Sequence, residues 1–145
     1  KYRPMRVNKL LYNHPLGMNL YGLNWSKDNI KTMGKAIVFE SEKSVLMYAS
    51  YFGWDNNISV ACCGSSLSAR QIQLLKDAGA KEIQEIGDKE FKHLTRNLTR
   101  INDKYKNDVN ISFIFDKNMI TGYKASPIDE GSEKFLILFK ERILL

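Results

Sequence analysis

The stretch AIVFESEKS at residues 36–44 decides the fold of this chain. Its first four residues form a short apolar run, which predicts a buried strand, and its polar end leads into a helix predicted over residues 42–52. Four apolar residues of that helix fall on one face, and Gly53 supplies the stop. A buried strand that leads directly into an amphipathic helix is typical of an α/β sheet with crossover helices.

The alternation of strand and helix continues along the chain. We expect strands at residues 58–63, 81–86 and 109–115, helices at 68–78 and 89–106, and a last helix from Pro127 to about Ile143. The strand at 81–86 is partly polar and is expected to be less enclosed than the others. Upstream, Leu10-Leu11-Tyr12 predicts a strand, and a short helix capped by Ser26 is expected to reach Met33. The predicted fold class is therefore α/β, with a mostly parallel sheet of about four strands flanked by helices.

Bulk composition favours one soluble domain. The chain has 145 residues, of which 43% are hydrophobic, and it contains no apolar run long enough to span a bilayer and no signal peptide. We therefore expect a cytoplasmic protein without a membrane partner. The first residue is not methionine and the last residues are apolar, so both ends look cut from a longer protein.

Two further features bear on partners and metals. Cys62 and Cys63 are neighbours in an apolar run, and with only two histidines in the chain they predict buried, reduced thiols rather than a zinc site. The net charge of +6 favours a polyanionic partner. A solvated helix face explains the basic residues between 89 and 106 equally well.

Acidic residues follow three of the predicted strands. Glu40 ends the first, Asp88 follows the third with Glu90 two residues on, and Asp116 follows the fourth. Carboxyl ends of parallel strands meet at one edge of a sheet, where several carboxylates repel one another unless a divalent cation lies between them. Oxygen ligands favour Mg²⁺ or Mn²⁺. The alternative is that each acid caps the helix after it.

The turn Gly64-Ser65-Ser66, before a helix capped at Ser68 with Gln71 three residues later, offers backbone amides and hydroxyls to a phosphate group. It is also an ordinary connection between a strand and a helix, and both interpretations stay open.

The order of these motifs resembles the TOPRIM domain, a Rossmann-like fold, of DnaG-type DNA primases, in the divergent form found in phages and mobile elements. Glu40 falls on the family's catalytic glutamate, the turn at 64–68 is similar to its Gly-Thr-x-Leu-Thr segment, and residues 85–90 resemble its second acidic motif. Residues 124–129 resemble the segment before the last helix of the family's domain, and residues 14–24 resemble the segment that precedes TOPRIM in primases. The resemblance implies a segment at 1–34 that ends the primase N-terminal subdomain, and a TOPRIM catalytic domain at 35–145.

The resemblance also implies a mechanism. It assigns catalysis to Glu40, a metal site to Glu40, Asp88, Glu90, Asp116 and Asp129, and nucleotide phosphates to Lys43, Gly64, Ser65 and Ser66. The implied reaction is nucleotidyl transfer with Mg²⁺ or Mn²⁺, which makes RNA primers for DNA replication. The implied partners are a single-stranded DNA template, ribonucleoside triphosphates and, through parts outside this chain, a replicative helicase. Whether this part of the protein primes alone stays open.

The chain departs from the family at four positions: Ser41, Ser44, Glu90 and Ala125. Ser41 replaces a glycine, Ser44 and Ala125 stand where acids are common, and Glu90 replaces an aspartate. These departures keep one alternative open, a catalytically weakened TOPRIM module that binds metal and nucleotide or nucleic acid. Among enzymes, the alternative is a TOPRIM nuclease. For Tyr21 and Trp25, stacking on template bases is the functional interpretation, and packing in the core is the structural one.

Overall fold

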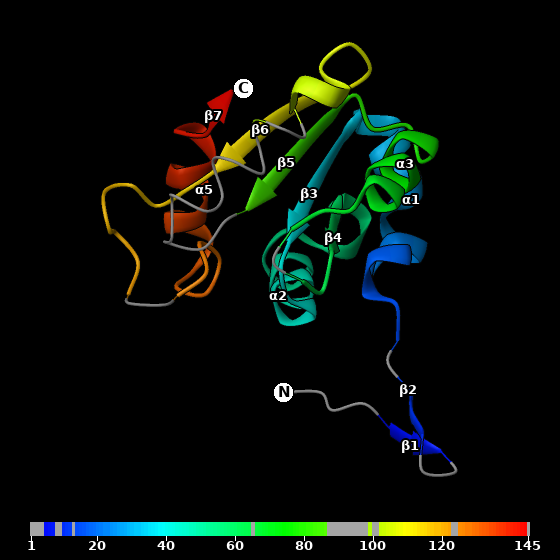
Figure 1. The fold of residues 1–145 in the computed structure, drawn as a ribbon. Helices are drawn as coiled ribbons and strands as arrows, with labels where there is room; N and C mark the ends of the chain where they lie inside the picture. Colours follow the sequence, from blue (N-terminus) through cyan, green and yellow to red (C-terminus); the bar gives the residue numbers. More distant parts are fainter. Residues whose placement is uncertain are drawn as a thin grey trace.

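A five-stranded sheet forms the centre of the structure (Figure 1). The computed structural model describes residues 5–7, 10–12, 14–64, 66–86, 99, 102–122 and 125–144. In the sheet order, the strands are β4 (Ser59–Ala61), β3 (Lys35–Phe39), β5 (Glu82–Ile86), β6 (Asn110–Ile114) and β7 (Ile143–Leu144). Neighbouring strands are parallel except for β7, which pairs antiparallel with β6. The mostly parallel α/β sheet predicted from the sequence is confirmed.

Helices cover both faces of this sheet. They are α1 (Leu23–Met33), α2 (Glu42–Phe52), α3 (Ala69–Asp77) and α5 (Ser132–Lys140), with 3₁₀ turns η1 (Leu16–Met18) and η2 (Trp54–Asn56). Aromatic rings join α2 and α5 to β3, since the Phe135 ring lies 6.2 Å from that of Phe39 and 5.8 Å from that of Tyr48. β1 (Met5–Val7) and β2 (Leu10–Tyr12) pair in a separate sheet. Within the described ranges, no helix has both the length and the apolar character that crossing a bilayer requires.

β5 is more enclosed than its sequence predicted. Its polar residues predicted a less enclosed strand, but β5 lies in the middle of the sheet and its last four residues, 83–86, are all buried. The reason is that hydrogen bonds satisfy part of the polar surface. The Gln84 amide, for instance, donates to the Glu82 carboxylate at 2.9 Å.

Two predicted helix starts were wrong. The last helix begins at Ser132 rather than Pro127, because a turn at 127–130 and Gly131, with a φ of 109°, intervene. It ends at Lys140, and β7 follows it. The first helix begins at Leu23, so Ser26 lies inside it, buried, where its hydroxyl donates to the Gly22 carbonyl. The structure bears out the helix at 42–52 and the capping box of Ser68 and Gln71.

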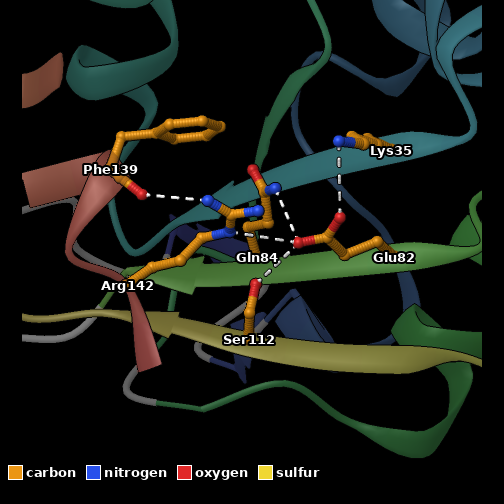
Figure 2. A network of polar contacts seen from close by, with 6 residues as sticks. All are labelled: Lys35, Glu82, Gln84, Ser112, Phe139 and Arg142. Carbon is orange, nitrogen blue, oxygen red and sulfur yellow. Dashed lines mark hydrogen bonds and ion pairs between the residues drawn. The ribbon is translucent and has the colours of Figure 1, made fainter. Parts of the chain in front are cut away.

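A polar network fixes the amino end of the sheet, away from the edge where ligands are expected (Figure 2). The Glu82 carboxylate accepts hydrogen bonds from Ser112 Oγ at 3.1 Å and Arg142 Nε at 3.2 Å, and Lys35 Nζ lies 3.6 Å from it. Burial alone would raise the pKa of Glu82, but the bonds from Gln84, Ser112 and Arg142 outweigh it, so the pKa is lowered. Arg142 thereby ties the turn before β7 to β5.

Candidate active site at the carboxyl end of the sheet

Glu40 lies where the sequence predicted, directly after β3 and two residues before α2 begins. Its side chain is exposed. The loop that follows β4 starts beside it, because the Cys62 N–H donates to the Phe39 carbonyl at 3.0 Å. The end of β3, the start of α2 and the loop after β4 therefore meet at one edge, where parallel sheets bind ligands.

Lys43, in the first turn of α2, contacts Asp129. Its Nζ lies 3.1 Å from Asp129 Oδ1, although the two residues are 86 positions apart. The other carboxylate oxygen of Asp129 accepts the Ser126 N–H at 3.0 Å, which fixes the turn before α5. The structure thus brings two predicted site residues together and places the 125–129 segment beside the start of α2.

Asp116 has a different environment. Its carboxylate accepts the backbone N–H groups of Ile120 and Thr121 at 2.9 and 2.8 Å, and the Thr121 hydroxyl at 2.6 Å. The residue is only 4% exposed. Three hydrogen bonds to a buried carboxylate stabilise the loop after β6. These bonds use lone pairs that a metal ion would need, so coordination by Asp116 stays a prediction that competes with this structural role.

The predicted metal centre is described only in part. Asp88, Glu90 and Ser65 lie outside the described residues, as does Lys124 of the 124–129 motif. Within the described ranges, no three His, Cys, Asp or Glu side chains lie close enough together to hold an ion. Glu40 fits a hard cation as an exposed oxygen donor at the correct edge. The expectation that Asp88 and Glu90, in the segment after β5, complete the site stays a prediction.

Some polar groups of the predicted phosphate-binding turn already form hydrogen bonds within the protein. Gly64 is half-buried and its carbonyl accepts the Cys62 thiol at 3.0 Å, while Ser66 is exposed. At the start of α3, the Gln71 N–H donates to Ser68 Oγ at 3.1 Å. Phosphate binding at this turn stays a prediction that depends on the exposed hydroxyl of Ser66 and the remaining amides.

Glu85 lies near the site but was not among the predicted site residues. This β5 residue is 5% exposed, its carboxylate accepts the Leu67 N–H, and its Oε2 is buried with no partner among the described residues. Burial raises the pKa of Glu85 to about 7, although the Leu67 bond opposes the shift. The sequence held a signal for this burial. Glu85 lies two positions after Ile83 in the strand, so the two side chains share one face of the sheet.

Glu85 lies beneath the loop after β4. Through Leu67, it joins the central strand to the loop that carries Gly64 and Ser66. It also acts on Cys62. Burial raises the pKa of the Cys62 thiol to about 11, and the carboxylates of Glu85 and Glu40 add to the shift. Glu40, Cys62 and Glu85 are thus electrostatic neighbours.

Neither cysteine takes part in a disulfide, and the prediction of two buried thiols holds for Cys62 but not for Cys63. Cys62 is buried, and Cys63 is half-buried just after β4 with a φ of 57°. Burial raises the pKa of Cys63 to about 12, and the nearby Glu42 carboxylate adds to the rise. Both thiols therefore stay protonated near neutral pH, which makes them poor nucleophiles.

The fold and the edge geometry define a class, the α/β domains of the TOPRIM type. No family model matches the sequence. Among solved structures, the chain is similar to the Escherichia coli primase catalytic core, with a TM-score of 0.68 and 23% identity over 97% of this chain and 43% of that one. It is equally similar, at 21% identity and a TM-score of 0.68, to a DnaG primase catalytic domain bound to single-stranded DNA. The chain therefore has the TOPRIM fold of DnaG primase catalytic cores.

One sequence relative is a phage protein. The SPbeta prophage-derived uncharacterized protein YorJ of Bacillus subtilis strain 168 is 30% identical over 99% of this chain. This similarity agrees with the expected likeness to phage proteins. The chain spans 42% of that relative and 43% of the Escherichia coli core, less than half of either.

Proposed function

We propose that this chain is the catalytic core of a phage-like DNA primase, which joins ribonucleotides into a short RNA primer on single-stranded DNA. One observation carries the proposal: the chain shares the fold of a DnaG primase catalytic core over 97% of its length, and this fold presents Glu40 at the carboxyl end of β3. The Lys43–Asp129 contact at the same edge supports it. β5, from which Asp88 follows, lies between β3 and β6, and this order favours a shared site.

In this proposal, Glu40 acts at the reacting atoms. Its carboxylate accepts the proton of the attacking hydroxyl and, with Asp88 and Glu90, holds a divalent ion. Asp116 and Asp129 are candidates for weaker contacts to it. When bound, Mg²⁺ or Mn²⁺ would supply positive charge that stabilises the triphosphate and the two oxygens that enter and leave at phosphorus.

Lys43 and the turn at Gly64, Ser65 and Ser66 position the nucleotide phosphates. Lys43 is mostly exposed, with 69% of its side chain accessible, so it can reach a phosphate at modest cost. Glu85 supports the turn from below through the Leu67 N–H. It is therefore a positioning residue rather than a catalytic one.

The whole protein's partners follow from the same proposal. They are the template strand, ribonucleoside triphosphates and a replicative helicase reached through other parts of the protein, all in the cytoplasm. We also propose that residues 35–145 form the catalytic domain and that 1–34 complete the preceding subdomain. The end of segment 1–34 joins the main sheet, because Tyr21 and Ala61 exchange backbone hydrogen bonds at 2.9 and 3.0 Å, whereas β1 and β2 pair in a separate sheet.

One observation favours a second candidate, a TOPRIM module that binds nucleotide or nucleic acid with weak turnover. Ser44, which stands where the resemblance expects an acid, is 3% exposed, and its hydroxyl lies 3.2 Å from that of Ser41. This pair offers no carboxylate to a metal ion. A TOPRIM nuclease would use the same predicted acids.

Primer synthesis by the full-length parent protein separates these candidates. We expect the wild type to make short RNA on a single-stranded DNA template with Mg²⁺ or Mn²⁺, and Glu40→Gln to lose most of this synthesis. Glu133→Gln, which removes an exposed carboxylate on α5, is the matched control and should retain activity. Unchanged synthesis in Glu40→Gln would disprove the catalytic role. A wild type that binds template but makes no RNA would favour the binding module, and one that cuts DNA would favour the nuclease.

A further inference from the structure

An open groove of about 530 Å³ lies along α2, beside the start of α1. The side chains of Leu46 and Met47 give it an apolar part, and Leu46 is 46% exposed. Polar side chains surround this part, and the complete lining is Tyr21, Ser41, Glu42, Lys43, Leu46, Met47 and Ser50. Accessible apolar side chains in an open groove are a common feature of surfaces that bind peptides.

Aromatic rings extend this surface beyond Tyr21. The Tyr21 ring meets the Trp25 ring at a centroid distance of 5.6 Å, and Trp25 meets Trp54 at 5.4 Å, both edge to face. Trp25 is 47% exposed and Trp54 50% exposed. Core packing, the structural interpretation of this region, holds for Tyr21, which packs partly against the core, but not for Trp25. Two large rings thus present accessible surface.

The backbone around these rings is held in place. Asn29 Nδ2 donates to the carbonyls of Trp54 and Asn57, both at 3.1 Å, and so joins η2 to α1. Gly22, with a φ of 84°, lets α1 approach α2 closely, since a Cβ there would lie 3.1 Å from Val45 Cγ1. A surface fixed in this way loses little conformational freedom when it binds a partner.

Acidic side chains accompany the rings and the groove. Asp28 lies one turn after Trp25 in α1 and therefore on the same side of that helix, and it is exposed. Asp55, also exposed, directly follows Trp54 in η2. Glu42 lines the groove itself. Within the described ranges, these three carboxylates form no ion pair.

The nearby cations leave this negative charge in place. Lys43, which also lines the groove, is already paired with Asp129 at 3.1 Å. Lys27 lies two positions after Trp25 in α1, so it lies on a different side of the helix. The surface therefore repels a phosphate backbone and attracts a positively charged group.

Tryptophan rings bind the same kind of group. A cation within about 6 Å of a ring centroid is attracted by the negative face of the ring, and tryptophan is the best of the aromatic side chains in this respect. Arginine is favoured over lysine, because its planar guanidinium also stacks on the ring. A purely apolar partner is disfavoured, because it would bury exposed carboxylates without a counter-charge.

We propose that a basic segment of a partner polypeptide docks here, with its apolar side chains in the groove and its arginine or lysine side chains over the two tryptophan rings. The carboxylates of Asp28 and Asp55 stabilise the same cations. Arginine, tryptophan and tyrosine are the residue types that contribute most to binding at protein interfaces. This docking goes beyond the proposed function, and it holds whether or not the protein makes primers.

Fluorescence anisotropy with the full-length parent protein tests the docking. The probe is a labelled peptide of about eight residues, blocked at both ends, with leucines in one half and arginines in the other, and it spans roughly 27 Å when extended. We expect saturable binding at low salt in buffer with EDTA. The same peptide with citrulline in place of arginine keeps the shape without the charge, and it should bind about tenfold more weakly.

Substitutions separate the rings from the acids. Trp25→Ala and Trp54→Ala should each raise the Kd of the arginine peptide about fivefold. The double variant Asp28→Asn/Asp55→Asn should also raise it about fivefold and make it less sensitive to salt, because two opposite charges are lost. The two aspartates are exposed, so this variant tests the proposal even where loss of a tryptophan impairs folding.

Two matched controls should keep the wild-type Kd. Tyr51→Ala removes an exposed ring of α2 that does not line the groove, and Glu133→Gln removes an exposed carboxylate of α5. Far-UV circular dichroism melts establish that each variant is folded. A wild-type Kd in the folded aspartate double variant, or in folded Trp25→Ala/Trp54→Ala, would overturn the proposal.

Two other occupants of the surface would also overturn it. For a labelled oligothymidylate of about 12 nucleotides, a Kd that rises in the tryptophan double variant and falls in the aspartate double variant would assign the surface to nucleic acid. In analytical ultracentrifugation, a sedimentation coefficient that rises with protein concentration in the wild type but not in the tryptophan double variant would assign it to a second copy of the chain.

Discussion

Lys43 Nζ and Asp129 Oδ1 lie 3.1 Å apart and join the first turn of α2 to the turn that precedes α5. The contact brings together two predicted site residues that lie far apart in the sequence. It also places a counter-ion against the lysine that we assign to phosphate, so a nucleotide must compete with Asp129 for that charge.

Substitutions on the two sides of this pair should therefore have opposite effects on nucleotide binding. Lys43→Gln should weaken triphosphate affinity, whereas Asp129→Asn should strengthen it by up to about fivefold, because an exposed ion pair is worth at most about 1 kcal/mol. Isothermal titration calorimetry with a ribonucleoside triphosphate measures both changes. Lys106→Gln, in the exposed pair with Asp103, is the control. If Asp129→Asn weakens binding instead, Asp129 serves the metal ion rather than Lys43.

Divalent ions should raise the melting temperature through Glu40. We expect Mg²⁺ or Mn²⁺ to stabilise the wild type, and Glu40→Gln or Asp88→Asn to abolish this stabilisation, because each removes a charged oxygen ligand. Differential scanning fluorimetry over a series of ion concentrations measures the effect. Equal shifts in the wild type and both variants would show that these residues share no ion.

Asp116→Asn separates two roles of one carboxylate. If the Asp116 carboxylate anchors the loop after β6, Asp116→Asn should lower the melting temperature in metal-free buffer, because the hydrogen bonds from Ile120 and Thr121 weaken. The rise caused by the metal should then persist. Loss of that rise in a folded Asp116→Asn protein would instead assign Asp116 to the metal site.

The raised pKa of Glu85 should make the free energy of unfolding depend on pH. Its pKa is about 7 in the folded protein against an ordinary value of 4.5. Between these values the unfolded chain has lost the proton while the folded protein keeps it, so the free energy of unfolding falls as pH rises, by roughly 3 kcal/mol in total, and levels off above pH 7. Glu85→Gln, which keeps the shape without the charge, should remove this fall. Urea unfolding at pH 5, 6, 7 and 8 measures it, and Glu133→Gln should behave as the wild type. Parallel curves for wild type and Glu85→Gln would contradict the shift.

Gln71 should be among the costliest polar side chains to lose. It is 1% exposed, and its Nε2 donates to the carbonyls of Leu16, Asn19 and Cys62 at 3.1, 2.8 and 3.0 Å. Gln71→Leu leaves these groups without their donor and should lower the free energy of unfolding by roughly 2–4 kcal/mol. Gln73→Leu, on the exposed side of α3, should change it by less than about 0.5 kcal/mol. Chemical denaturation compares the two.

Local patterns predicted the fold where one physical effect dominated. The apolar run of β3, the stop at Gly53 and the capping box of Ser68 each fix their structure within a few residues. Pro127 misled because proline suits both a turn and the first turn of a helix, and the Asp129 carboxylate stabilises the turn. Ser26 misled because a cap residue is also accepted inside a helix, where its hydroxyl bonds to the carbonyl one turn back.

The residues of the candidate site also differ in how well the sequence predicts them. Glu40 was predictable because a strand end fixes its place, and the structure puts it there. The Lys43–Asp129 contact was not, since it depends on where the last turn packs. Glu85 was missed because a single glutamate in a strand usually faces solvent, and only the central position of β5 buries it. Asp88 and Glu90 lie outside the described residues, so their convergence on Glu40 stays a prediction.

The Gln71 amide also limits how the protein can be shortened. Two of its three acceptor carbonyls belong to Leu16 and Asn19, upstream of every strand in the main sheet. A version trimmed to begin at residue 35 would remove two of the three acceptors of this amide and expose the apolar surface that Leu20 and Ile30 cover. An expression fragment of this domain should therefore start before Leu16, although the sequence motifs alone suggest a later start.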